Sequence, residues 1–169
     1  KTQIRGHLAL GSNGEYKSLT WDEKLKVLEI FVKNKGDKVI MAGTGCESTK
    51  ETIELSKEAI KIGADFVSVL TPSYFKKIID DDVLINYYTE IADNVSVPLL
   101  IYNAPGFTGG ITVSKQAVRK LAKHPNILGM KDSSKAGIMG YITSTMDIED
   151  FHVLAGSISF FFTGLVCGA

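Results

Sequence analysis

Short apolar runs alternate with amphipathic stretches along the whole chain, and this pattern predicts an α/β fold. The apolar runs lie at residues 7–10, 38–42, 64–70, 97–103, 127–131 and 152–155. The run at 64–70 is nearly unbroken, as expected of a strand buried on both faces. Strands that alternate with helices in this way run parallel and are joined by right-handed crossovers.

The stretches between these runs carry helix signals. Helices are expected from Thr20 to the residues before Gly36, over 48–62, 80–93, 112–123 and 136–145, and after Ser157. The patterns TWDE at 20–23 and STKE at 48–51 are capping boxes. Ser157 is expected to cap the final apolar helix.

About six strand–helix units result, and two architectures fit them: an open doubly wound sheet or a (β/α)8 TIM barrel. A complete barrel typically needs about 250 residues, whereas this chain has 169. As a barrel it would be incomplete, with about six of eight units present. No linker, low-complexity tract or shift in composition divides the chain, so we expect a single partial barrel domain over 1–169.

Charge and composition narrow the function classes. Basic and acidic residues balance to a formal net charge of zero, and 44% of the residues are apolar. The sequence contains no basic patch that would predict a nucleic-acid partner, and none of its apolar runs is long enough to span a membrane. No signal-peptide pattern is present, and we expect a cytoplasmic protein. Because the sequence begins at Lys1 rather than at methionine, a targeting segment before it is left open.

The residue types that bind metals are sparse. Cys46 and Cys167 lie far apart, outside any metal-ligand spacing, and we interpret them as two unpaired thiols in a reducing compartment. The three histidines are also scattered, so neither a zinc site nor a separate cofactor is expected.

In a barrel, functional side chains lie at the carboxyl ends of the strands. The residues at or just beyond those ends are Ser12, Asn13, Thr44, Tyr74, Tyr102, Asn103, Lys131, Gly156 and Ser157. One lysine and two tyrosines are therefore predicted to converge on one rim. The glycine-bearing loop at 11–15 offers N–H groups that suit a carboxylate, although it lacks the pattern of a P-loop.

Lys131 closes the buried run ILGMK. Poor solvation there favours the neutral amine, which can form a Schiff base with a ketone. The alternative is a lysine that reaches the rim and pairs with Asp132. Tyr102 ends the run LLIY, and its phenol is placed to exchange protons beside an imine. The alternative interpretation of Tyr102 is a tyrosine at the rim whose hydroxyl is solvated by water.

Four motifs together resemble the dihydrodipicolinate synthase/N-acetylneuraminate lyase family of class I aldolases. They are GSNGE at 11–15, TPSY at 71–74, YNAPGFTG at 102–109 and GMKDS at 129–133. Their order and spacing match across nearly the whole chain. The resemblance implies a TIM barrel that acts on a pyruvate-type 2-keto acid through a lysine imine.

The resemblance also implies roles for individual residues. Lys131 matches the Schiff-base lysine and Tyr102 the tyrosine that moves protons beside it. Ser12 and Asn13 match the pair that holds the pyruvate carboxylate, and we add Gly156 and Ser157 as candidate substrate-binding residues. Tyr74 matches a tyrosine that, in many members, reaches a neighbouring subunit's site and joins a proton relay through the Ser12 position. That match implies a homodimer or homotetramer.

Two departures from the family's synthases bear on the substrate. Asn13 stands where the synthases usually have threonine, and Phe107 stands where they usually have an arginine for the substrate carboxylate. An apolar ring cannot replace a guanidinium. The motifs look more like those of 4-hydroxy-2-oxoglutarate aldolases and 2-keto-3-deoxy sugar acid aldolases. The alternatives are a dehydratase or a dihydrodipicolinate synthase that uses the same imine, and a catalytically silent pyruvate-binding regulator.

Overall fold

The computed structural model describes residues 3–169, and its centre is one sheet of six parallel strands. The strands follow each other across the sheet in chain order. Their bounds are β1 Gly6–Ala9, β2 Val39–Gly43, β3 Phe66–Leu70, β4 Leu99–Asn103, β5 Ile127–Asp132 and β6 His152–Ala155. All six predicted strands are therefore present, with shifts of one or two residues at most ends.

Within the described residues, six α-helices accompany the strands: α1 Trp21–Lys33, α2 Thr49–Ile62, α3 Asp81–Asn94, α4 Lys115–Leu121, α5 Met139–Thr145 and α6 Phe161–Cys167. The capping box at the start of α1 is confirmed, since Thr20 and Glu23 bond each other's backbone N–H groups. Four 3-10 turns, Ser12–Gly14, Tyr16–Ser18, Pro105–Phe107 and Ile158–Phe160, were not predicted.

Three predicted helix starts are wrong, each for a local reason. The helix expected from residue 112 begins only after Ser114, whose hydroxyl accepts the Ala117 N–H and caps α4. The helix expected from residue 136 begins later because Gly137 adopts a left-handed φ of 78°. Ser157 caps the 3-10 turn Ile158–Phe160 rather than the final helix, which starts at Phe161.

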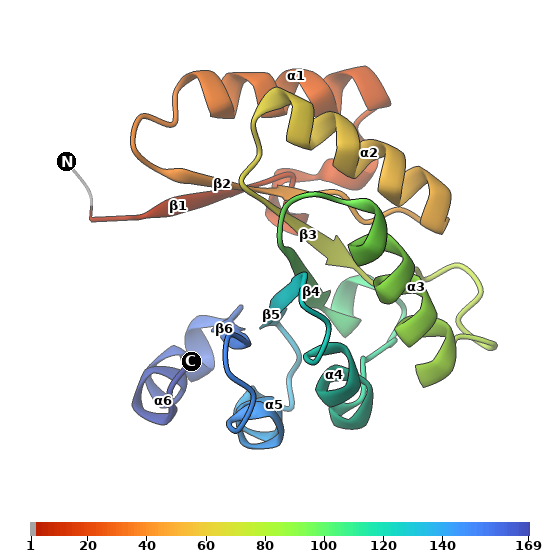
Figure 1. Cartoon of the computed structure of the whole chain (residues 1–169), viewed down its shortest axis with the longest axis vertical. Helices are drawn as coiled ribbons and strands as arrows, with labels where there is room; N and C mark the ends of the chain where they lie inside the picture. The colour runs from red at the N-terminus through yellow and green to blue at the C-terminus, as the bar shows by residue number, and fades with distance from the viewer. Residues whose placement is uncertain (1–2) are drawn as a thin grey trace.

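The order of the strands decides between the two architectures. Consecutive parallel strands joined by right-handed crossovers place every helix on the same face of the sheet, whereas a doubly wound sheet covers both faces. Figure 1 shows the sheet curling, with the helices along its outer side. The chain is thus part of a (β/α)8 barrel, and the flat-sheet alternative is wrong.

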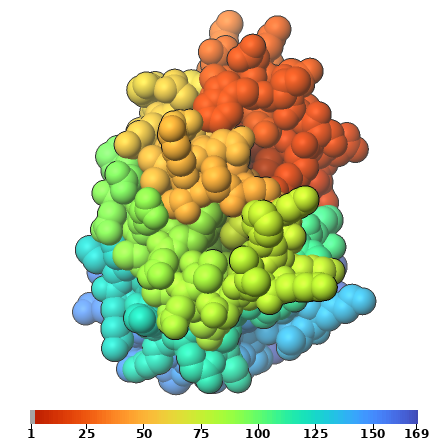
Figure 2. All heavy atoms as spheres, turned by 90° about the vertical axis from the view of Figure 1, so that its right-hand side faces the viewer, coloured from red at the N-terminus to blue at the C-terminus, as the bar shows by residue number. Residues whose placement is uncertain are grey.

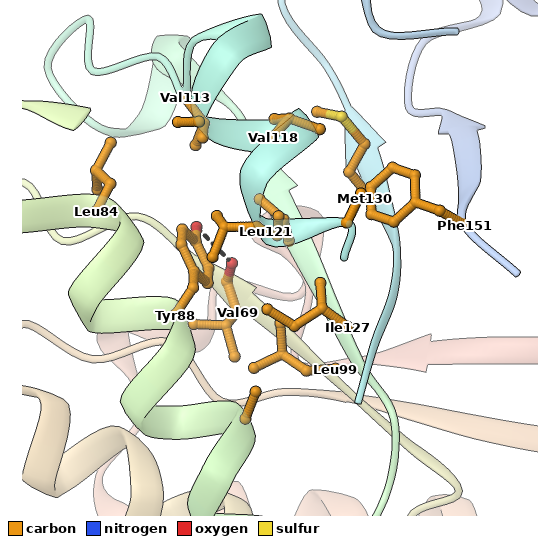
Figure 3. Close-up of a cluster of buried hydrophobic side chains, with 14 of the residues drawn as sticks. Val69, Leu84, Tyr88, Leu99, Val113, Val118, Leu121, Ile127, Met130 and Phe151 are labelled. Atoms are coloured by element: carbon orange, nitrogen blue, oxygen red, sulfur yellow. Dashed lines mark hydrogen bonds between the residues drawn. The ribbon is translucent and has the colours of Figure 1, made fainter. Parts of the chain in front are cut away.

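A hydrophobic core fills the space between the sheet and the helices α3, α4 and α5. In Figure 3, Leu99 and Ile127 from neighbouring strands point toward Leu121 of α4. The buried Tyr88 ring of α3 packs into the same cluster, and its hydroxyl donates to the Val69 carbonyl at 3.1 Å. This core holds β4 and β5 in place, and those two strands carry the candidate lysine and tyrosine.

Leu99→Ala tests this core. The side chain is fully buried, so the substitution should lower the free energy of unfolding by about 2–5 kcal/mol. The matched control is Leu165→Ala, at a side chain that is 57% exposed. That change should stay within about 0.5 kcal/mol of wild type. Urea denaturation of the three proteins measures both values, and equal effects would contradict the assignment of Leu99 to the core.

Candidate active site

Two of the predicted residues meet at the carboxyl end of the sheet, on neighbouring strands. Tyr102 of β4 and Lys131 of β5 are partners in the parallel register. Because paired residues on adjacent strands point to the same face, both side chains enter the inside of the curve. The Lys131 Nζ lies 4.4 Å from the centre of the Tyr102 ring. Tyr102 is buried and Lys131 is half-buried, so the amine has one open side.

Ser12 joins this pair from the loop after β1. The Ser12 Oγ and the Tyr102 hydroxyl lie 3.2 Å apart and share a hydrogen bond. The chain reaches this point through Leu10, which is buried and holds a left-handed φ of 58°, a strained conformation for a branched side chain. The Leu10 carbonyl packs against Gly43 of β2, where an added Cβ would lie 2.2 Å from the oxygen. Close packing therefore fixes the direction in which Ser12 points.

Asn13 follows Ser12 in the 3-10 turn Ser12–Gly14, and it is exposed. The turn closes when the Gly14 N–H donates to the Gly11 carbonyl at 2.9 Å. The first N–H groups of such a turn have no partner within it, which leaves them to bind a ligand. The turn thus presents a hydroxyl, an amide and backbone N–H groups beside Tyr102.

Gly156 and Ser157 lie at the end of β6, next to β5. The Gly156 N–H donates to the Asp132 carbonyl at 2.7 Å, and an added Cβ would lie 2.1 Å from the Ser133 Oγ. The Ser157 hydroxyl accepts the Ser159 N–H at 3.3 Å. Lys131 pairs with Leu154, so Gly156 and Ser157 lie two and three residues beyond its partner in the register. Both have local structural roles, and their part in binding a substrate stays a prediction.

Two other residues predicted at the rim, Tyr74 and Thr44, make different contacts. Tyr74 is 78% exposed in the loop between β3 and α3, where its ring meets Phe75 edge-on, 4.9 Å between centroids. Among the described hydrogen bonds its hydroxyl has no bond to Ser12 or Tyr102, so its place in the site stays a prediction. Thr44 is fully buried and accepts the Ser56 hydroxyl of α2 at 2.8 Å, which makes it part of the helix layer.

Asp132 follows the lysine but faces away from it. Successive strand residues point to opposite faces, so the Asp132 carboxylate lies on the helix side of the sheet. There it is fully buried and accepts hydrogen bonds from the Asn103 amide at 2.7 Å and from the Ser134 hydroxyl at 2.9 Å. The alternative in which Lys131 pairs with Asp132 is therefore wrong among the described residues, whose ion pairs do not include it.

The polar network behind the sheet extends to α5. The Asn103 amide also donates to the Tyr141 hydroxyl at 3.2 Å, and that hydroxyl donates to the Val113 carbonyl at 2.8 Å. Burial raises the pKa of Tyr141 to about 12, and the negative charge of Asp132 adds to this effect. Tyr141 therefore stays protonated at neutral pH and keeps donating. The network ties the ends of β4 and β5 together directly behind Tyr102 and Lys131.

Asp132→Asn tests the network. Its three donors, two from Ser134 and one from Asn103, would meet a side chain with a single acceptor oxygen. At least one buried donor would lose its partner, so the free energy of unfolding should fall by about 1–3 kcal/mol. Asp37→Asn, at a side chain that is 97% exposed, is the matched control and should change little. An equal effect of both variants on the denaturation midpoint would show that the network adds no stability.

The sequence pattern indicated Asp132 only as a possible partner of Lys131 and missed Glu47, which follows β2 and accepts the Ser73 and Tyr74 N–H groups. A carboxylate inside a buried strand, next to an asparagine at the end of the neighbouring strand, was an available signal for the first. Within residues 3–169 we find no group of three or more histidine, cysteine, aspartate or glutamate side chains that could hold a metal ion. No helix in that range is long and apolar enough to cross a bilayer.

Known proteins resemble this chain in sequence. Residues 2–169 match the sequence model of the Dihydrodipicolinate synthetase family. A 4-hydroxy-tetrahydrodipicolinate synthase from Methanospirillum hungatei is 38% identical over 157 residues, which cover 90% of this chain and 52% of that protein. A probable mitochondrial 4-hydroxy-2-oxoglutarate aldolase from Emericella nidulans is 36% identical over 137 residues, covering 78% of this chain and 44% of that protein.

Solved structures share the fold. A prophage protein of the dihydrodipicolinic acid synthase family from E. coli K12, in complex with pyruvate, superposes with a TM-score of 0.90 at 31% identity. The superposition covers 99% of this chain and 57% of that protein. The chain spans about half the length of the curated relatives it matches.

Proposed function

Because the chain belongs to the dihydrodipicolinate synthetase family, we propose that it acts as a class I aldolase that releases pyruvate from a 2-keto acid. One observation carries the proposal. The Lys131 amine, the Tyr102 phenol and the Ser12 hydroxyl form a continuous contact at the carboxyl end of the sheet. A nucleophilic amine beside a proton-exchanging pair is what imine chemistry requires.

The reaction begins when the neutral Lys131 amine attacks the ketone carbon of the substrate. A C–N bond forms and the carbonyl oxygen leaves as water, with one proton taken up from solvent, which gives a protonated imine. The face of the Tyr102 ring, 4.4 Å from Nζ, stabilises that positive charge. Tyr102 then takes the proton of the C4 hydroxyl, while its own phenol proton passes to solvent through the Ser12 hydroxyl, and the C3–C4 bond breaks. The bonding electrons move into the imine, the aldehyde departs, and an enamine of pyruvate remains.

Completion needs a proton and a water molecule. Protonation of the enamine at C3 restores the imine, and its hydrolysis frees pyruvate and regenerates the amine. The hydrogen bond between Ser12 and Tyr102, at 3.2 Å, gives the phenol a partner through which its proton can be exchanged. We assign Ser12 and Asn13 to the substrate carboxylate, and Gly156 and Ser157 to the other side of the substrate.

The choice of substrate rests on Phe107. Its ring is 60% exposed in the 3-10 turn just after β4 and offers no charge to a second carboxylate. This supports cleavage of a 2-keto-3-deoxy sugar acid over condensation with aspartate semialdehyde. Cleavage of 4-hydroxy-2-oxoglutarate, which carries a second carboxylate, is supported instead by the similarity to the relative from Emericella nidulans. The name of the relative from Methanospirillum hungatei favours the synthase as second candidate.

The experiment is to incubate the protein with pyruvate and borohydride and to locate the added mass. The proposal expects a reduced adduct on Lys131, and the absence of any adduct would contradict it. Product analysis then separates the activities. Only an aldolase frees pyruvate from a 2-keto-3-deoxy sugar acid, a dehydratase expels water instead, and a synthase consumes pyruvate with aspartate semialdehyde.

We further propose that the protein works as a homodimer or homotetramer. Tyr74 is 78% exposed, and the neighbouring Phe75 and Ile78 are 65% and 70% exposed. Exposed apolar side chains in one loop suit a subunit contact. A monomer in sedimentation analysis of the active protein would contradict this. The cytoplasmic location and the absence of a cofactor stay predictions.

A further inference from the structure

Glu47 connects the loops that surround the candidate site. It lies between β2 and α2, and its carboxylate accepts hydrogen bonds from the Ser73 N–H at 2.8 Å, the Ser73 hydroxyl at 2.9 Å and the Tyr74 N–H at 2.9 Å. On the other side it meets the Lys17 ammonium at 3.4 Å, in the segment after Ser12. One side chain therefore contacts the loops that follow both β1 and β3.

The loop after β3 needs such an anchor. The loop residues Tyr74, Phe75 and Ile78 are mostly exposed, so no packed side-chain pocket fixes the Tyr74 ring. In Figure 2 the loop (yellow-green) stands out from the molecular surface, beside the segment that leads into α2 (orange). With the ring in solvent, the backbone must set its position, and the backbone N–H of Tyr74 is bound by Glu47.

Glu47 is itself held in place. The N–H of the preceding Cys46 donates to the Thr52 hydroxyl at 3.0 Å, and the Cys46 carbonyl accepts the Tyr87 hydroxyl at 3.0 Å. Both hydroxyls are buried, and they lie 2.9 Å from each other. The peptide before Glu47 is thus fixed from α2 and from α3, which gives the carboxylate a stable base.

The hydrogen bonds also keep Glu47 charged. Partial burial would raise the pKa of its carboxyl, but the Ser73 and Tyr74 N–H groups, the Ser73 hydroxyl and Lys17 together lower it. Charge-assisted bonds to backbone N–H groups are stronger than neutral ones. The ion pair with Lys17, exposed by about half on both sides, adds little by comparison.

We infer that Glu47 is a positioning residue for catalysis, which holds the Tyr74 loop so that the Tyr74 phenol can complete the proton relay at the Ser12 and Tyr102 pair of an assembled site. The inference rests on the proposed function. Glu47 touches neither Lys131 nor Tyr102, and because its exposed ion pair with Lys17 adds little, it acts through Tyr74. The effect of its loss should therefore depend entirely on the presence of the Tyr74 hydroxyl.

The test compares Glu47→Gln, Tyr74→Phe and the double variant with wild type in pyruvate-releasing turnover. Glu47→Gln should lower kcat by about ten- to a hundredfold, the scale expected for a misplaced catalytic group, with little change in KM. The double variant should be no slower than Tyr74→Phe alone. Glu54→Gln is the matched control, since Glu54 is exposed on α2 and contacts only Lys50 among the described ion pairs. It should match wild type.

Hydrogen exchange of the segment 71–80 provides a readout independent of turnover. Exchange should be faster in Glu47→Gln than in Glu54→Gln, while the melting temperatures stay equal. The inference is overturned if Glu47→Gln turns over like the control, if the two losses multiply in the double variant, or if exchange is unchanged. If wild type forms no pyruvate adduct, the proposed function fails, and exchange still decides whether Glu47 holds the loop.

Discussion

Replacing Lys131 by alanine should abolish both the borohydride-trapped pyruvate adduct and turnover. The amine is the only group at this end of the sheet that we expect to form the covalent intermediate, and the methyl group of alanine cannot. Loss of a covalent nucleophile lowers kcat on the order of 10⁴- to 10⁶-fold in enzymes where it has been measured. Mass spectrometry of the trapped protein and a coupled assay for pyruvate measure the two effects.

Two further variants sharpen this test. Lys131→Arg keeps a cation over the Tyr102 ring but offers no nucleophilic amine, so it should be as inactive as alanine. Lys135→Ala removes an exposed lysine four residues along the chain and should leave adduct and turnover unchanged. Turnover above one tenth of wild type in Lys131→Ala would remove the imine from the mechanism, and an adduct on Lys135 would reassign it.

The fold was largely predictable because it depends on patterns that repeat. Each strand is a local apolar run, and each of the helices α1 to α4 starts at a local side-chain cap such as Thr20 or Ser48. The curvature was harder to predict, since an open sheet and a barrel share this alternation. The strand order separates them, and it depends on contacts between distant segments such as β1 and β2.

The site was predictable only where strand ends identify it. Tyr102 and Lys131 occupy the ends of neighbouring strands, and the parallel register brings them together. Asp132 differs, because its role depends on the face of the sheet to which its side chain points. Strand residues alternate between the two faces, and this alternation places Asp132 on the face opposite to Lys131 only once the bounds of β5 are known. Glu47 carries no local signal at all, since its partners lie 26 and 27 residues away in the loop after β3.

Tyr102→Phe should give a protein that folds and forms the imine but turns over slowly. The substitution keeps the ring face next to Lys131 and removes only the hydroxyl, whose partner is Ser12. Loss of a general acid–base group lowers kcat by about 10²- to 10⁴-fold. Steady-state assays of pyruvate release, together with borohydride trapping, separate the slow proton transfers from imine formation.

The control is Tyr88→Phe, which removes a buried hydroxyl that donates to the Val69 carbonyl in the core. It should lower the free energy of unfolding by about 1 kcal/mol, the worth of one hydrogen bond, without slowing turnover. The kcat of Ser12→Ala should lie between the kcat values of Tyr102→Phe and Tyr88→Phe, because this variant keeps the Tyr102 phenol but loses the hydroxyl that bonds to it. A Tyr102→Phe variant as fast as wild type would assign the proton transfers to another group. A variant with no adduct would instead place Tyr102 in imine formation itself.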